Sequence, residues 1–113
     1  MNSTVSDFID ITKLQLHDKI ILETEEESWT LKVIGPAAAI VELTTTSRTL
    51  RLTKPVIGQI VEAFESDEFQ LRHPLRIIKG WKMRIKFEDT DVVTAAVTTA
   101  VIEGASGWFY EVF

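Results

Sequence analysis

The chain has 113 residues, of which 45% are hydrophobic and 26% are charged, and its formal net charge at pH 7 is −5. These values are typical of one globular domain and exclude wholesale disorder, so residues 1–113 are expected to form a single domain. The negative charge disfavours nucleic acid and anionic membrane as partners of the whole molecule. Because the chain contains no cysteine, disulfides, thiol nucleophiles and thiolate metal ligands are excluded.

The N-terminal residues predict neither a secretion signal nor a membrane segment. Residues 1–7 contain no basic run and no long apolar stretch. The longest uncharged run, residues 92–102, is too short to cross a bilayer as a helix. We therefore expect a cytoplasmic protein without membrane contact. Residues 1–13 are interpreted as a loose arm or a short helix, because Val5, Phe8 and Ile9 have helical spacing.

Residues 14–22 predict a turn that leads into a strand, and residues 29–34 predict the strand that follows. In the second segment Trp29, Leu31 and Val33 alternate with polar residues and share one face. The acidic residues 25–27 interrupt the apolar pattern between the two segments, so the two strands are predicted to form a hairpin. Pro36 ends the hairpin, since proline cannot donate to a strand ladder. Further strands are expected over residues 39–46 and 49–53, which are rich in β-branched side chains.

Residues 55–66 fit two interpretations. Ile57, Ile60, Val61 and Phe64 have the spacing of one helical face. Gly58 disfavours a helix by about 1 kcal/mol relative to alanine. The acidic residues that follow Phe64 would equally suit a turn between two strands. The segment is left open between helix and strand.

The clearest strand pattern in the chain covers residues 81–87, where four apolar residues alternate with three cations. A strand here would turn the apolar set to the core and the cations to solvent. The apolar set is Trp81, Met83, Ile85 and Phe87, and the cations are Lys82, Arg84 and Lys86.

Four segments complete the chain. Residues 88–91 predict a turn, and the uncharged residues 92–102 predict a central strand covered on both faces. Residues 104–107 predict a hairpin loop, and residues 108–113 the last strand. The expected fold is therefore mainly β: a small antiparallel barrel or two-sheet sandwich, with at most two short helices, in the N-terminal segment and over 55–66.

No set of catalytic or metal-binding residues can be assembled from the sequence. His17 precedes Asp18, but neighbours in an extended chain point in opposite directions, which favours a solvated turn histidine over a general base. Ser106 lacks the spacing of a nucleophile elbow. The acids of residues 88–91 lack the offsets of a calcium loop. We predict a protein without enzymatic activity, cofactor or metal.

One basic stretch stands out against the acidic remainder. Residues 72–86 hold six of the twelve lysines and arginines and no acid, so the rest of the chain, with six basic and 17 acidic residues, has a net charge of −11. On a strand, alternate cations would lie about 6.6 to 6.8 Å apart on one face, close to the spacing of nucleic-acid phosphates. The candidate residues are Arg72, His73, Arg76, Lys79, Lys82, Arg84 and Lys86.

The basic stretch has no aromatic platform for bases, because Trp81 and Phe87 would face away from the cations. Charge runs usually mark solvated faces, so we predict that the stretch pairs mainly with the protein's own acidic turns or with an acidic protein partner. Near the C-terminus, residues 108–110 are three adjacent aromatics, and at least one must point away from the core. An exposed aromatic on an edge strand, such as Phe109, can anchor a partner chain.

Three functions remain open from the sequence. The leading hypothesis is a non-catalytic binding or structural module that acts through protein–protein contact. The alternative is a small-barrel nucleic-acid-binding protein that uses residues 72–86. The third is an enzyme built on scattered acids and the two histidines. Fold class does not rank them, because small β folds host all three functions.

Overall fold

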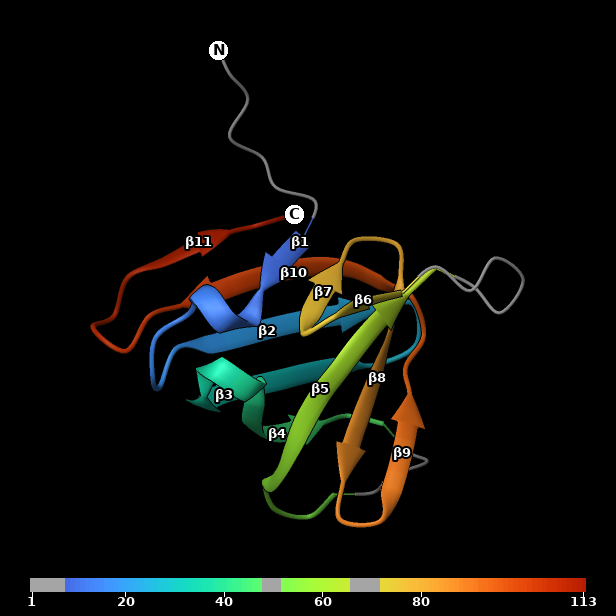
Figure 1. Cartoon of the computed structure of the whole chain (residues 1–113). Helices are drawn as coiled ribbons and strands as arrows, with labels where there is room; N and C mark the ends of the chain where they lie inside the picture. Colours follow the sequence, from blue (N-terminus) through green and yellow to red (C-terminus); the bar gives the residue numbers. More distant parts are fainter. Residues whose placement is uncertain (1–7, 48–51, 66–71) are drawn as a thin grey trace.

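A computed structural model describes residues 8–47, 52–65 and 72–113 of the chain, and these residues are organised almost entirely as antiparallel strands (Figure 1). The mainly β fold expected from the sequence is therefore confirmed. The elements are β1 (Phe8–Asp10), η1 (Ile11–Lys13), β2 (Lys19–Thr24), β3 (Ser28–Gly35), η2 (Pro36–Ala38), β4 (Ile40–Thr45), β5 (Val56–Phe64), β6 (Arg72–Pro74), β7 (Arg76–Ile78), β8 (Lys82–Phe87), β9 (Thr90–Val93), β10 (Val97–Glu103) and β11 (Phe109–Glu111), where η1 and η2 are single 3-10 turns.

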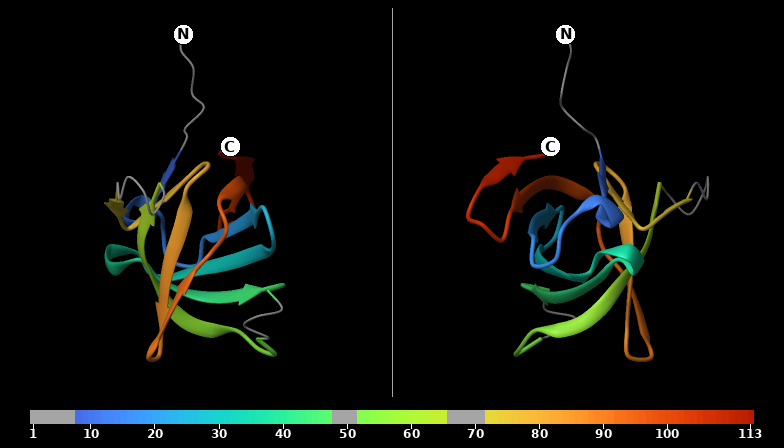
Figure 2. Two further views of the ribbon diagram at one scale, coloured as in Figure 1. Left: turned by 90° about the vertical axis from the view of Figure 1, so that its right-hand side faces the viewer. Right: turned by 60° about the vertical axis from the view of Figure 1, so that its left-hand side comes forward.

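The strands form two antiparallel sheets. The large sheet has the order β11-β10-β2-β3-β4-β5-β8-β9, with β6 also paired to β5, and the small sheet consists of β1 and β7. The large sheet curves around the core, and the small sheet lies across its upper end (Figures 1 and 2). The curvature approaches that of a barrel, but the large sheet does not close, and β9 and β11 form its two ends.

The hairpin predicted from the N-terminal third is confirmed as β2 and β3. Leu22 pairs with Trp29 and Ile20 with Leu31 across the two strands. These four side chains are all buried in the core. The alternation in the sequence therefore predicted correctly which face of β3 is buried. The strand expected over residues 39–46 is β4, whereas most of the one expected over 49–53 lies outside the described residues.

The ambiguous segment 55–66 forms strand β5, which settles the choice against a helix. Ile60 pairs with Ile85 and Glu62 with Arg84, so the register of β5 against β8 shifts at the residue between them. The shift is a β-bulge, and it turns both Ile60 and Ala63 inward although they are three positions apart. Of the residues with helical spacing, Ile60 and Phe64 are buried but Ile57 is 60% exposed, so the set does not share one buried face.

Strand β8 has the predicted register. Met83 and Ile85 have no exposed surface, and Phe87 is buried. Of the cations, Lys86 is exposed, whereas Lys82 and Arg84 are half-buried. Trp81 lies just before the strand and is also half-buried, so it contributes less to the core than the alternation predicted.

The prediction of one covered central strand over residues 92–102 is wrong. Strand β9 ends at Val93, which is 51% exposed, and β10 begins only at Val97. Between them the chain crosses from β8 toward β2: the Thr94 amide donates to the Met83 carbonyl at 2.9 Å, and the Glu25 amide donates to the Ala96 carbonyl at 3.1 Å. An uncharged, threonine-rich run carries no signal that marks such a crossing.

Two further predictions change, one for the N-terminal segment and one for the turn before β9. Residues 8–10 form strand β1, which pairs with β7, so the arm or helix expected over 1–13 is wrong there, and residues 1–7 lie outside the described part. The short turn η1 follows β1 and is capped by Asp10, whose Oδ1 accepts from the Thr12 amide at 3.0 Å. The turn expected over 88–91 is confined to residues 88 and 89, because Thr90 and Asp91 already belong to β9.

The core lies inside the curved sheet and is completed from above. Ile11 of η1 and Ile77 of β7 have no exposed surface and join the side chains of the large sheet in one cluster. Neither 3-10 turn in the described part has the length or the apolar character needed to cross a membrane.

Candidate functional site

The outer face of the large sheet carries a continuous row of side chains. Paired residues in antiparallel strands project to the same face, so the register defines the row. It begins at an exposed aromatic on the edge strand, crosses an acid, two lysines and a second acid, and ends at an exposed isoleucine. In order, the row is Phe109, Glu103, Lys19, Lys32, Glu42 and Ile57.

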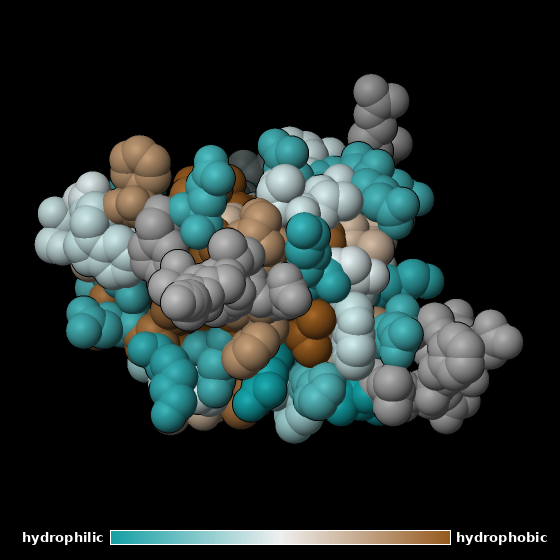
Figure 3. Space-filling model, turned by 90° about the horizontal axis from the view of Figure 1, so that it is seen from above, coloured by the Kyte–Doolittle hydropathy of each residue, from teal (hydrophilic) through white to brown (hydrophobic). Residues whose placement is uncertain are grey.

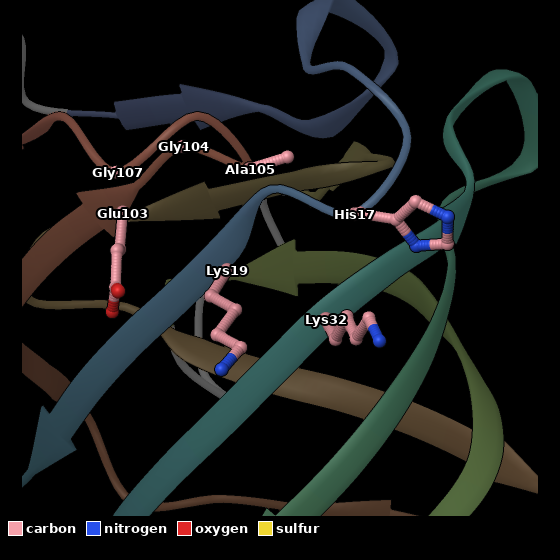
Figure 4. Close-up of a pocket in the computed structure, with 7 residues that line it drawn as sticks. All are labelled: His17, Lys19, Lys32, Glu103, Gly104, Ala105 and Gly107. Carbon is pink, nitrogen blue, oxygen red and sulfur yellow. The ribbon is translucent and has the colours of Figure 1, made fainter.

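A hollow of about 340 Å³ opens on the middle of this row (Figure 4). Lys19 lies between Glu103 and Lys32, as the register requires, and His17 lies beside Lys32 (Figure 4). The loop that joins β10 to β11 forms the upper rim. The lining residues are His17, Lys19, Lys32, Glu103, Gly104, Ala105 and Gly107. Three of the side chains that line the hollow are therefore lysine or histidine.

His17 is held in position by backbone bonds to β3. Its amide donates to the Val33 carbonyl at 2.7 Å, and the Val33 amide donates to the Asp18 carbonyl at 2.8 Å. The residue has a φ of 74°, a left-handed conformation that turns the chain sharply before β2. The two bonds fix the turn against β3, so the exposed imidazole is presented from a rigid support.

Asp18 serves the structure and does not pair with His17. Its side chain is buried, with Oδ2 accepting from the Gln15 amide at 2.9 Å and Oδ1 from the Ala105 amide at 3.3 Å. Among the described residues no hydrogen bond or ion pair joins the two side chains. The carboxylate instead ties the turn before β2 to the loop after β10. This arrangement agrees with the interpretation of His17 as a solvated turn histidine.

The loop of residues 104–107 uses its own backbone amides. The Gly104 amide donates to the Trp108 carbonyl at 2.6 Å, and the Gly107 amide donates to the Gly104 carbonyl at 2.9 Å. A Cβ on Gly104 would lie 2.2 Å from Cε2 of Trp108, so the indole ring needs a glycine beneath it. The Ala105 amide donates to Asp18, so the amides of all three loop residues that line the hollow are already bonded.

Strand β11 is an end of the large sheet and pairs with β10. Phe109 is 72% exposed and Trp108 is 46% exposed. The prediction that an aromatic of residues 108–110 points away from the core is therefore confirmed. Seen from above, hydrophobic side chains form small areas separated by hydrophilic ones (Figure 3). Trp108 and Phe109 are therefore two adjacent exposed aromatic residues at this end of the large sheet.

The basic stretch predicted as a site is divided among several local contacts. Arg72 forms an ion pair with Glu62 of β5. Arg84 lies 3.5 Å from the same carboxylate and 3.2 Å from Asp91 of β9. The hydrogen bond that Arg84 donates to Asp91 raises the pKa of Arg84 above its usual value. The two arginines thus pair with the protein's own acids, but these acids lie on the neighbouring strands β5 and β9 and not in turns, as the prediction had placed them.

The other members of the stretch make aromatic contacts or face solvent. The guanidinium of Arg76 lies 4.8 Å from the centre of the Phe8 ring, and the rings of His73 and Trp81 are 5.3 Å apart. Lys79 and Lys86 are exposed and Lys82 is half-buried. No ion pair within 4 Å involves these three lysines in the described part of the chain. The stretch as a whole does not form one convergent site.

The residues of the hollow were not singled out from the sequence, apart from His17. Lys19 and Lys32 come together only through the register of the β2–β3 hairpin. A signal was present, because pairing Leu22 with Trp29 across the predicted turn places the two lysines opposite each other. Sequence reasoning located the hairpin but did not fix its register.

Among the described residues, no group of three or more His, Asp or Glu side chains is placed to hold a metal ion. The sequence matches no protein-family model, and neither the curated proteins nor the solved structures that were compared with it include a similar chain.

Proposed function

We propose that this protein is a non-catalytic binding module that recognises an extended segment of another protein through strand β11. The observation that carries the proposal is Phe109, an aromatic residue 72% exposed on a strand at the end of the large sheet. An edge strand presents unpaired backbone N–H and C=O groups, which can pair with an added strand. The absence of cysteine agrees with action in the cytoplasm.

The length of β11 limits what its backbone can contribute. Three residues span about 10 Å, which provides only a few hydrogen bonds, each with a net value of about 1 kcal/mol. Affinity must therefore come mainly from a side-chain anchor, and aromatic residues dominate such contacts. Phe109 is placed for this role, because its side chain stands on the outer face beside the free edge.

The charges around Phe109 indicate the chemistry of the partner. Glu103 is the cross-strand neighbour of Phe109, and Glu111 lies two residues further along the same face. Both carboxylates would attract a segment that carries an apolar residue against Phe109 and basic residues beside it. A second copy of the chain is disfavoured as the occupant, because each copy has a net charge of −5.

The proposal can be tested by titrating the ¹⁵N-labelled protein with extended peptides. A peptide of alternating valine and lysine should shift the amide signals of residues 109–111, and a valine–glutamate peptide of equal length should not. Phe109→Ala should weaken binding about tenfold or more, because an anchor contributes about 2 kcal/mol.

Ile57→Ala provides the matched control. Ile57 is 60% exposed and ends the same row of side chains, but it lies on β5, far along the sheet from β11. Its truncation should leave the affinity unchanged. Equal losses from the two substitutions, or peptide shifts away from β11, would contradict the proposal.

A further inference from the structure

We propose that the hollow lined by His17, Lys19 and Lys32 binds the phosphate group of a small phosphorylated molecule. This site adjoins the surface around Phe109, with Glu103 between them, and goes beyond the protein contact proposed above. Its three potential donors come from the turn before β2, from β2 itself and from β3, and all line one hollow (Figure 4).

The first argument is the placement of two like charges. Lys19 and Lys32 are directly opposite each other in the register of β2 and β3. Their Cβ atoms are therefore about 4.5 to 5.5 Å apart, and like charges at such positions destabilise a sheet. An anion bound between the two ammonium groups would replace this repulsion by two charge-assisted hydrogen bonds.

The second argument is that the charges of these lysines are not neutralised by the protein. All ion pairs within 4 Å in the described part of the chain involve Arg72 or Arg84, which lie on other strands. Glu103 neighbours Lys19 and Glu42 neighbours Lys32 in the row, yet neither carboxylate reaches ion-pair distance. Arg72 and Arg84 of the basic stretch are paired with acids, whereas the lysines of the hollow are available to a ligand.

The third argument is the fixed position of His17. The hydrogen bonds on either side of this residue hold its turn against β3, the strand that carries Lys32. A donor on a rigid support loses little conformational freedom on binding. The imidazole and the two ammonium groups supply three donors, which suits the three terminal oxygens of a phosphate monoester.

The size and surroundings of the hollow favour a small molecule over a polymer. A volume of about 340 Å³ leaves room for an organic group attached to the phosphate. Glu103 lies on the rim, and the net charge of the chain is −5, so a polyanion would meet repulsion beyond the first phosphate.

The test is a titration of the ¹⁵N-labelled protein at constant ionic strength with inorganic phosphate, phenyl phosphate and malonate. Phosphate should shift the amide signals of His17, Lys19 and Lys32, with a dissociation constant in the millimolar range. Phenyl phosphate should bind at least threefold more tightly, and malonate more weakly than either. Equal binding of phosphate and phenyl phosphate would assign the site to free phosphate and overturn the part of the proposal that concerns an organic group.

Substitutions give the result that decides the proposal. Lys19→Gln and Lys32→Gln should each weaken phosphate binding about tenfold, the effect of losing one charge-assisted hydrogen bond. Lys54→Gln removes the same charge from an exposed position outside the hollow and should change nothing. Glu103→Gln should strengthen binding, a gain that damage to the fold cannot mimic. Equal losses in Lys19→Gln and Lys54→Gln, or no gain in Glu103→Gln, would overturn the proposal.

Discussion

Ile85 shows how much one inward residue of β8 contributes to the core. It has no exposed surface and pairs with Ile60 of β5. Ile85→Ala removes buried methyl and methylene groups and leaves a cavity, so the free energy of unfolding should fall by about 2 to 5 kcal/mol. Urea denaturation monitored by circular dichroism measures this loss.

The neighbouring residue provides the control for that measurement. Lys86 is exposed on the opposite face of β8, and Lys86→Gln should change the free energy of unfolding by no more than about 0.5 kcal/mol. Losses of similar size at both positions would mean that the register of β8 is wrong.

Asp10 links stability to pH. Its Oδ1 accepts from the Thr12 hydroxyl at 2.5 Å, and this bond is the main cause of a pKa lowered from the ordinary 3.8. The Thr12 amide and the charge of Arg76 act in the same direction, and desolvation opposes them. A lowered pKa in the folded state stabilises the protein above about pH 3.8, and this stability is lost as the pH falls through the folded-state pKa.

Asp10→Asn should therefore make stability less dependent on pH below about 4, while it preserves a side chain able to cap η1. Thr12→Val removes the hydroxyl donor and should reproduce most of the effect. Thermal melts between about pH 2.5 and 6 would measure both changes. A variant with the same acid dependence as the parent chain would show that Asp10 does not contribute.

At the scale of elements, the sequence predicted strands well where alternation was regular and failed where the ladder was irregular. β3 and β8 follow strict alternation, and both were placed correctly. β5 contains a bulge that interrupts its alternation, and residues 94–96 cross between strands without a charge or a proline to mark the crossing. These features depend on how distant strands meet, which a local pattern does not contain.

The candidate sites follow the same rule. Phe109 was predicted because three adjacent aromatics cannot all face inward, which is a local argument. The Lys19–Lys32 pair depends on hairpin register, and the division of the basic stretch depends on Glu62 and Asp91 reaching it from other strands. Interactions within a segment could be read from the sequence, whereas interactions between segments needed the fold.

At the scale of the whole molecule, charge decides how the protein responds to nucleic acid. The net charge is −5, and the two arginines of β6 and β8 already pair with acids. We expect weak binding to single- and double-stranded DNA at about 150 mM salt, unchanged when Lys82, Arg84 and Lys86 are all replaced by alanine. Electrophoretic mobility shift would measure this.

The opposite result has a clear meaning. Tight, salt-sensitive binding that the triple variant abolishes would favour the nucleic-acid alternative over protein contact. The same titration of Lys19→Gln would show whether the hollow takes part, since that variant removes a cation from a different part of the large sheet.

The pairing of β2 with β10 has a consequence for biosynthesis. Ile20 and Leu22 of β2 pair with Ile102 and Ala100 of β10. These partners are synthesised about 80 residues later. At about 5 to 20 residues per second, the ribosome takes several seconds to deliver β10 after β2 has emerged. Throughout that interval the edge of β2 that pairs with β10 stays open. During synthesis the edge of β2 is therefore open to wrong strand pairing until the arrival of β10 covers it.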